Sequence, residues 1–177
     1  MLDLDSLINN PPLQATQNVL ETMTAILVLP DASLGIIGNV PERDRLEQQA
    51  QTIEYADRVT MLGFLKEYDD VLAHMRAADV FASPSTREGF GITFAEAMAA
   101  DCTVIAADHP ESAASEVIGD AGFLTSPTVD DLAAVLERAL AGDRPSTDPT
   151  ARAQRYDWDT VADQAAQCYR HAIDGTW

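Results

Sequence analysis

The chain contains few positively charged residues and almost no cysteine. Its 177 residues include 11 lysines and arginines against 29 aspartates and glutamates, and Lys66 is the only lysine. The resulting formal charge of −18 argues against binding to nucleic acid or to an anionic membrane, because both would repel such a surface. The two cysteines, Cys102 and Cys168, are too few for a disulfide framework or a zinc cluster. We expect both to be buried apolar side chains, and we expect no metal site.

Long apolar runs are also missing. No run reaches the length of about 18 residues that a membrane-spanning helix needs, and the acidic start of the chain does not resemble a secretory signal. We therefore expect a cytoplasmic protein. The 46% hydrophobic content is too high for a disordered chain and can supply the core of one domain. We interpret the acidic surface as an adaptation to the saline cytoplasm of a halophile, and an ordinary acidic protein is the alternative.

Strand and helix patterns alternate along the chain, which predicts an α/β fold with a mostly parallel sheet. The predicted strands are 34–37, 59–62, 80–82 and 103–107, with a short edge strand at 123–124. The predicted helices are 18–28, one that opens at 41–47, 69–76, 92–100, 129–141 and 159–173. We divide the chain into an N-terminal segment of uncertain structure (1–17), a main domain (18–145), and a linker with a C-terminal helix (146–177).

Two carboxylates, Glu88 and Glu96, lie eight positions apart around a Gly-Phe-Gly turn that leads into the predicted helix 92–100. The turn and the first helical turn can direct unpaired N–H groups, and the positive end of the helix dipole, at an anion. Carboxylates accept hydrogen bonds from hydroxyl groups. In parallel sheets ligands bind beyond the carboxyl ends of the strands, where this motif should lie. Because a sugar nucleotide carries both phosphates and hydroxyls, the pattern predicts a site for one.

The stretch from Glu88 to Glu96 resembles the E-x7-E motif of the retaining glycosyltransferases of family 4, also called group 1, which have the GT-B fold. Further segments resemble successive parts of the C-terminal, donor-binding domain of that family in the same order: 30–38, 58–65, 78–85, 103–107 and 115–118. The resemblance covers roughly residues 20–140. It implies one Rossmann-like half of a GT-B fold, a three-layer sandwich with a mostly parallel sheet.

The resemblance also implies roles for individual residues. It implies a domain that binds a nucleotide-diphospho-sugar for hexosyl transfer without a cofactor. Glu88 is implied to lie beside the donor sugar as the catalytic residue, and Glu96 to accept hydrogen bonds from the ribose hydroxyls. The other donor-binding residues would be Gly89, Phe90, Gly91 and Ile92 at the phosphates, Gly63, Phe64 and Leu65 in the loop that holds the base, and Gly38 in the first glycine turn.

Parts of the family pattern are missing from the sequence. The N-terminal acceptor domain is not recognisable, and no lysine or arginine precedes Arg43, although the family places two cations before this point to face the diphosphate. We therefore expect a donor-binding half that needs an acceptor-domain partner, rather than a complete enzyme. A homodimer that pairs exposed sheet edges is a further expectation. The alternatives are a non-catalytic nucleotide-sugar-binding or interaction module, and a different nucleotide-sugar enzyme such as a 2-epimerase.

Overall fold

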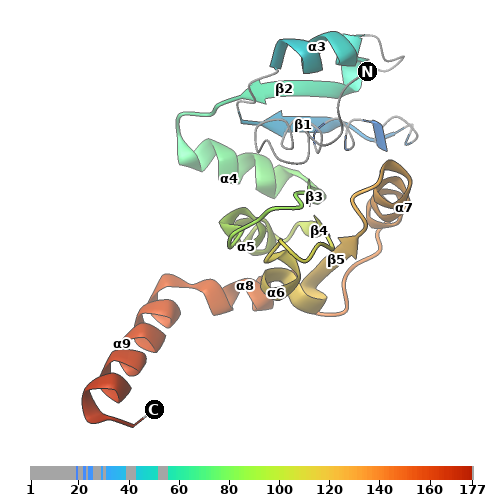
Figure 1. The fold of residues 1–177 in the computed structure, drawn as a ribbon. Coiled ribbons are helices and arrows are strands. Elements are labelled where there is room, and N and C mark those ends of the chain that lie inside the picture. The colour runs from blue at the N-terminus through green and yellow to red at the C-terminus, as the bar shows by residue number, and fades with distance from the viewer. Residues whose placement is uncertain are drawn as a thin grey trace.

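The computed structural model describes residues 31–38, 43–51 and 56–176, together with residues 19, 22, 24, 25 and 29. Strands and helices alternate along these residues (Figure 1). The elements are β1 (Leu34–Ile37), α3 (Arg43–Gln51), η1 (Ala56–Arg58), β2 (Val59–Gly63), α4 (Tyr68–Ala77), β3 (Val80–Ser83), α5 (Ile92–Ala99), β4 (Thr103–Ala107), α6 (Ala114–Ile118), η2 (Gly119–Ala121), β5 (Gly122–Thr125), α7 (Val129–Leu140), α8 (Pro149–Ala153), η3 (Gln154–Tyr156) and α9 (Trp158–Asp174).

Every predicted strand is confirmed, and so are the predicted helices from residue 43 onward, with bounds shifted by one or two residues at most ends. The predicted helix 18–28 falls mostly outside the described residues, and the predicted segment 1–17 falls entirely outside them. The segment 146–177, predicted as a linker with one C-terminal helix, contains an additional short helix, because α8 begins at Pro149. The carboxylate of Asp148 caps this helix by accepting a hydrogen bond from the Thr150 amide at 2.8 Å.

All of the strand pairs are parallel, as predicted. β1 pairs with β2, while β3, β4 and β5 form a second set with β4 in the centre and β5 at the edge. Among the described residues β1 and β3 share no ladder, so the strands form two hydrogen-bonded sets. Leu34 of β1 nevertheless packs in the same apolar cluster as Val80 and Ala82 of β3. The two sets therefore share one core.

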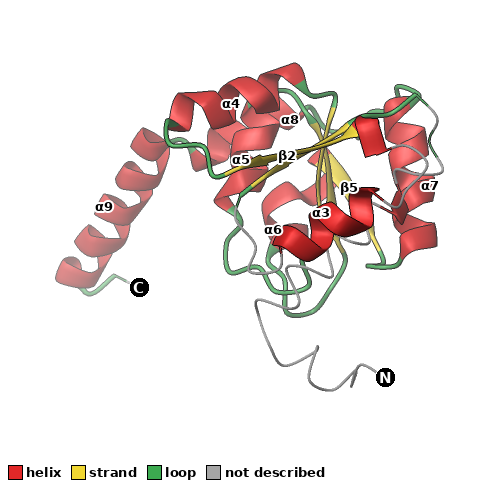
Figure 2. Cartoon of the chain, turned by 90° about the horizontal axis from the view of Figure 1, so that it is seen from above, coloured by secondary structure: helices red, strands yellow, loops and turns green. Residues whose placement is uncertain are grey.

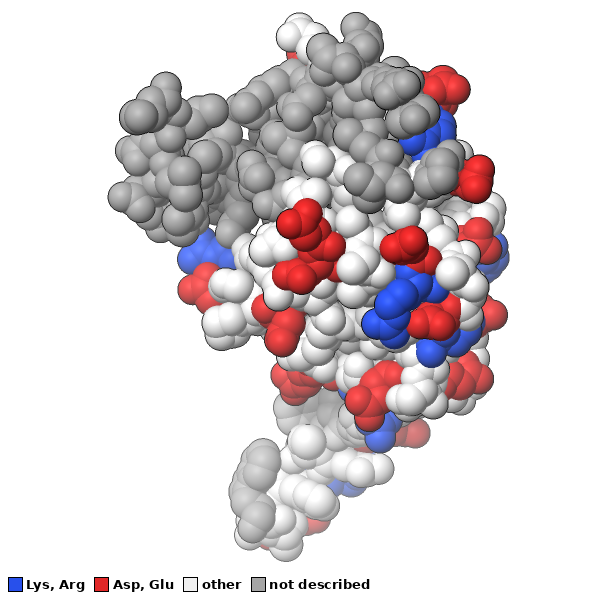
Figure 3. Space-filling model, turned by 90° about the vertical axis from the view of Figure 1, so that its right-hand side faces the viewer, with Lys and Arg blue, Asp and Glu red and all other residues white. Residues whose placement is uncertain are grey.

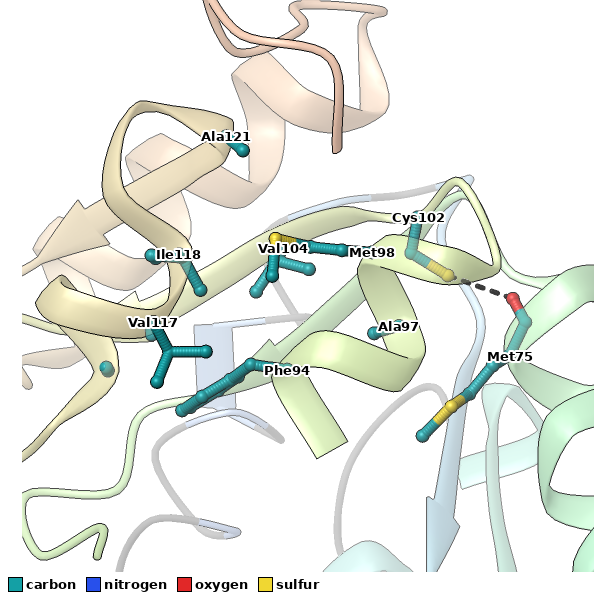
Figure 4. Close-up of a cluster of buried hydrophobic side chains, with 11 residues drawn as sticks. Met75, Phe94, Ala97, Met98, Cys102, Val104, Val117, Ile118 and Ala121 are labelled. Carbon is teal, nitrogen blue, oxygen red and sulfur yellow. Dashed lines mark hydrogen bonds between the residues drawn. The ribbon is translucent and has the colours of Figure 1, made fainter. Parts of the chain in front are cut away.

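One face of the β3–β4–β5 sheet is covered by α4, α5 and α6, and the other by α7 (Figures 1 and 2). Side chains alternate along β4, so Val104 lies on the first face and Ile105 on the second. On the first face the fully buried Phe94 and Met98 of α5 pack into the core (Figure 4). Each such burial stabilises the fold by about 1.5–3 kcal/mol. α5, the helix that carries the predicted motif, is thus a core element with a fixed position.

The two cysteines differ in environment. Cys102 is fully buried, and its thiol donates a hydrogen bond to the Met75 carbonyl at 2.9 Å (Figure 4), which confirms the prediction for this residue. The prediction for Cys168 is wrong, because this thiol is exposed. Cys168 lies on α9, which extends away from the body of the protein and has no buried residue (Figure 1). The apolar stripe of α9 therefore has no described neighbour to cover it.

Candidate functional site

The backbone of Glu88 is fixed to the loop that follows β4. The Ala113 amide donates to the Glu88 carbonyl at 2.9 Å, and Glu88 forms an isolated parallel bridge with Ser112. The neighbouring residue Arg87 adds an exposed salt bridge, with 3.1 Å between its Nε and the Oε2 of Glu111. These contacts hold the half-buried Glu88 beyond the carboxyl ends of β3 and β4, the edge of the sheet that the sequence predicts for the site.

Gly91 forms the entrance to α5 and has a left-handed conformation, with φ 74° and ψ 56°. A Cβ at this position would lie 2.5 Å from Cδ2 of Phe94 and 2.9 Å from Cγ of Glu88. Glycine is therefore required by the packing of the protein itself, before any ligand is considered. Gly89 differs, because a Cβ there would meet no atom within 4 Å. The space beside Gly89 is open.

The backbone amides at the start of α5 are available to a ligand. The turn closes with the Phe94 amide, which donates to the Gly91 carbonyl at 2.9 Å. Within the described part of the chain, the amides of Phe90, Gly91 and Ile92 donate to no protein acceptor. The first turn of α5 contains no acidic side chain that would compete for them. Unpaired amides and the positive helix end together can bind an anion.

The side chain of Phe90 is supported by the segment that the sequence analysis treated as a linker. Its ring packs edge-on against Tyr156, with 5.4 Å between the ring centroids. The Tyr156 hydroxyl and the Nε of Arg152 each donate to the Val117 carbonyl at 2.9 Å. The α8–η3 segment is in this way attached both to the end of α6 and to the motif turn. Sequence reasoning missed this support, although Asp148 followed by Pro149 is a helix-start signal.

The two other predicted glycine turns lie side by side at the ends of β1 and β2. The Gly38 amide donates to the Gly63 carbonyl at 2.8 Å, and both residues have positive φ, 119° and 70°. A Cβ on Gly63 would lie 2.6 Å from Nη1 of Arg43, which fills the space beneath the turn. The next residue, Phe64, is 71% exposed. The predicted base loop thus presents an uncovered aromatic ring to solvent.

Glu96 lies one turn into α5, and its carboxylate accepts a hydrogen bond from the hydroxyl of Tyr68. Tyr68 is the first residue of α4 and follows the predicted base loop. The hydrogen bond to Glu96 raises the pKa of Tyr68 to about 12, with smaller contributions from burial and from the negative charge of Glu96. At neutral pH Tyr68 is therefore a permanent donor. No local pattern in the sequence indicates this pairing, which joins residues 28 positions apart.

A cleft of about 370 Å³ lies at the opposite edge of the sheet, where β3 and β4 begin. Its lining includes Arg76, Asp79 and Arg144. Arg144 donates to the Asp101 carbonyl and to the Thr103 hydroxyl, each at 3.1 Å. Asp101 has a positive φ of 64°, so these bonds secure a strained turn after α5. The residues that line this cleft lie at the edge of the sheet away from the motif.

No group of three or more histidine, cysteine, aspartate or glutamate side chains among the described residues could hold a metal ion. Within the same residues, no helix is both long enough and apolar enough to cross a bilayer.

A parallel α/β domain with a glutamate on each side of a glycine helix entrance is typical of a sugar-nucleotide-dependent transferase. The model of the family described as glycosyl transferases group 1 matches residues 12–156. The chain belongs to this family, which confirms the family and fold predicted from the sequence.

The chain is similar to several known members. It is 34% identical over 152 residues to the phosphatidyl-myo-inositol mannosyltransferase of Mycobacterium tuberculosis, a match that covers 79% of this chain and 39% of that protein. Its structure is similar to sucrose-phosphate synthase from Thermosynechococcus elongatus, with a TM-score of 0.76 and 26% identity over 92% of this chain and 44% of the other. It is also similar to Anabaena HepE in complex with UDP-glucose, with a TM-score of 0.73 and 28% identity. That match covers 85% of this chain and 44% of the HepE chain. The chain thus spans about two fifths of the length of the curated relatives it matches.

Proposed function

We propose that this chain is the donor-binding half of a group 1 glycosyltransferase and that it binds a nucleotide-diphospho-sugar at the carboxyl edge of its strands. The observation that carries the proposal is the arrangement at the start of α5, where Glu88 packs on Gly91, unpaired amides follow, and Glu96 lies one turn further. HepE, a structural neighbour with 28% identity, was solved with UDP-glucose, which supports this class of ligand.

In the proposed complex the diphosphate lies at the amides of residues 90–92. Preorganised N–H groups there would stabilise the charge that grows on the leaving nucleotide as the bond to the anomeric carbon breaks. Glu96 would accept hydrogen bonds from the ribose hydroxyls, and Glu88 would lie beside the donor sugar. The base would lie against the loop of Gly63, Phe64 and Leu65, beside the turn at Gly38. The family resemblance implies that the transferred hexosyl group keeps its anomeric configuration.

The proposed site has few cations for the diphosphate. Arg43 pairs with Glu47 through a 2.6 Å contact, and Arg87 pairs with Glu111. We therefore propose that transfer needs an acceptor-binding half, on the same polypeptide or on a separate one, which would also supply positive charge. A homodimer is the second candidate partner, because among the described residues the strands that end the two hydrogen-bonded sets have no ladder partner on their outer side.

Calorimetry tests the proposed ligand directly. The chain should be titrated in concentrated KCl with UDP, GDP and ADP, and with their diphospho-sugars. We expect one base to give saturable binding, and its diphospho-sugar to bind at the same site. Absence of heat with every one of these compounds would contradict the proposed function and favour an interaction module. Sugar transfer by the isolated chain would contradict only the proposed need for an acceptor-binding half.

We also propose that the protein works in a saline cytoplasm. Acidic side chains are spread over the described surface in Figure 3, whereas the basic ones are fewer and gather mainly on one side of it. The described salt bridges, such as that of Arg138 with Asp143, are exposed and each contributes at most about 1 kcal/mol. Screening by salt therefore removes little favourable attraction between paired charges. It also weakens the self-repulsion that the net charge of −18 causes.

The expected result is that the midpoint of thermal unfolding rises by at least about 5 °C between dilute buffer and KCl at molar concentration, which corresponds to a gain of roughly 1–2 kcal/mol for a chain of this size. Circular dichroism measures the midpoint, and the same series in sucrose separates screening from general exclusion effects. A midpoint that falls as KCl is added would show that ion pairs outweigh self-repulsion and would remove the saline interpretation.

A further inference from the structure

The hydrogen bond between Tyr68 and Glu96 joins two parts of the proposed site. Tyr68 begins α4 three positions after Leu65 of the proposed base loop, and Glu96 lies on α5. Both helices are anchored in the core: Met75 of α4 and Phe94 of α5 belong to the same buried cluster. The bond therefore connects two fixed helices at the place where a nucleoside would cross from the base loop to the helix entrance.

We propose that Tyr68 is a positioning residue for donor binding, whose hydroxyl holds the Glu96 carboxylate in the orientation that receives the ribose hydroxyls. This inference rests on the proposed function, because it assigns Tyr68 a role only if a nucleotide binds at Glu96. By holding Glu96 in this orientation, Tyr68 would favour binding of a ribonucleoside diphosphate over a 2′-deoxyribonucleoside diphosphate.

The geometry indicates that Tyr68 orients the Glu96 carboxylate for a ligand and does not compete with the ligand for it. A carboxylate has two oxygens and about four acceptor positions, and Tyr68 occupies one position on Oε1. Oε2 remains for a ligand hydroxyl. A free glutamate side chain would have to be ordered when the ligand binds, whereas the bond to Tyr68 orders it beforehand. Tyrosine suits this task because it has only two side-chain torsions and its hydroxyl stays protonated at neutral pH.

Negative charge around the pair makes a neutral donor useful. Glu67 precedes Tyr68, and Asp69 and Asp70 follow it in the first turn of α4. In the described residues no lysine or arginine forms a salt bridge with Glu96. A tyrosine hydroxyl holds Glu96 without neutralising it, so the carboxylate remains a charged acceptor for the ribose.

The test compares Tyr68→Phe with the unaltered chain. Calorimetry in concentrated KCl measures binding of UDP and 2′-deoxy-UDP, with GDP and 2′-deoxy-GDP in place of them if the chain prefers guanine. We expect Tyr68→Phe to weaken ribonucleotide binding about 5- to 10-fold and to reduce the preference for ribose over deoxyribose. In a Glu96→Ala background the same change should have no further effect, because the group that Tyr68 positions is gone. Tyr169→Phe, an exposed tyrosine on α9, is the matched control and should change nothing.

Each outcome separates this inference from the proposed function. If the unaltered chain binds none of the nucleotides, the proposed function fails and the role of Tyr68 fails with it. If it binds and Glu96→Ala weakens binding, but Tyr68→Phe binds equally well or more tightly, only the positioning role is wrong. Equal weakening of ribo- and deoxyribonucleotide binding would indicate a general structural effect and would also overturn it. Thermal unfolding of Tyr68→Phe confirms that the variant is folded before it is titrated.

Discussion

Replacing Gly91 by alanine is expected to destabilise the protein by about 2–4 kcal/mol and to abolish nucleotide binding. Two costs add at this position. Alanine at a φ of 74° is strained, and its Cβ would lie 2.5 Å from the ring of Phe94. Phe94 is fully buried, so its ring cannot move aside without disturbing the core between α5 and β4. The helix entrance would then shift and its amides would no longer converge.

Chemical denaturation measures the loss of stability, and Gly89→Ala is the matched control two positions away. A Cβ on Gly89 meets no protein atom within 4 Å, so this variant should keep its stability to within about 0.5 kcal/mol. If the ligand approaches this backbone closely, Gly89→Ala should nevertheless weaken nucleotide binding. A Gly91→Ala protein as stable as the unaltered chain would contradict the tight packing of Gly91 against Phe94.

Replacing Glu96 by alanine is expected to weaken nucleotide binding on the order of 100-fold with little effect on folding. Hydrogen bonds to a charged acceptor are worth roughly 1.5–3 kcal/mol each, and the ribose offers two hydroxyls. The cost to stability should stay below about 1 kcal/mol, because among the described residues the carboxylate of the half-buried Glu96 bonds only to an exposed tyrosine. Calorimetry measures the affinity, and thermal unfolding measures the stability.

The control for this variant removes a carboxylate that lies outside the proposed site. Glu137 is exposed on α7, which covers the other face of the sheet. Glu137→Ala changes the net charge as Glu96→Ala does, so any general electrostatic effect on binding of an anionic nucleotide appears in both. Equal affinities of the two variants would mean that Glu96 has no specific contact with the ligand.

Most of the helices and strands could be predicted from the sequence, because hydrophobic spacing and helix-capping signals depend on residues that are close together in the chain. Thr128 caps α7 in this way, because its hydroxyl oxygen accepts a hydrogen bond from the Asp131 amide at 3.3 Å. The short apolar runs of β3 and β4 were found because both faces of these strands are covered. The exposed position of Cys168 was missed because an amphipathic pattern shows that a helix has an apolar face but not whether a neighbour covers it.

The site was predicted less completely than the fold. The motif from Glu88 to Glu96 could be read from the sequence, and its glycine entrance to α5 is confirmed. The reason for Gly91 was only partly foreseen, because its contact with Phe94 depends on a ring that turns back toward the helix start. Tyr68 and the support of Phe90 by Tyr156 depend on contacts between distant segments. The roles of the donor-binding residues remain predictions.

The most direct test of the central claim is a map of amide chemical shifts as a nucleoside diphosphate is added to the labelled chain. The account predicts that the shifted amides cluster at the carboxyl edge of the strands, at residues 89–92 and 63–65 and at Gly38. It predicts no change beside the cleft of Asp79 and Asp101 at the opposite edge. Saturable shifts confined to that opposite edge, or no saturable shift with any of UDP, GDP and ADP, would contradict it.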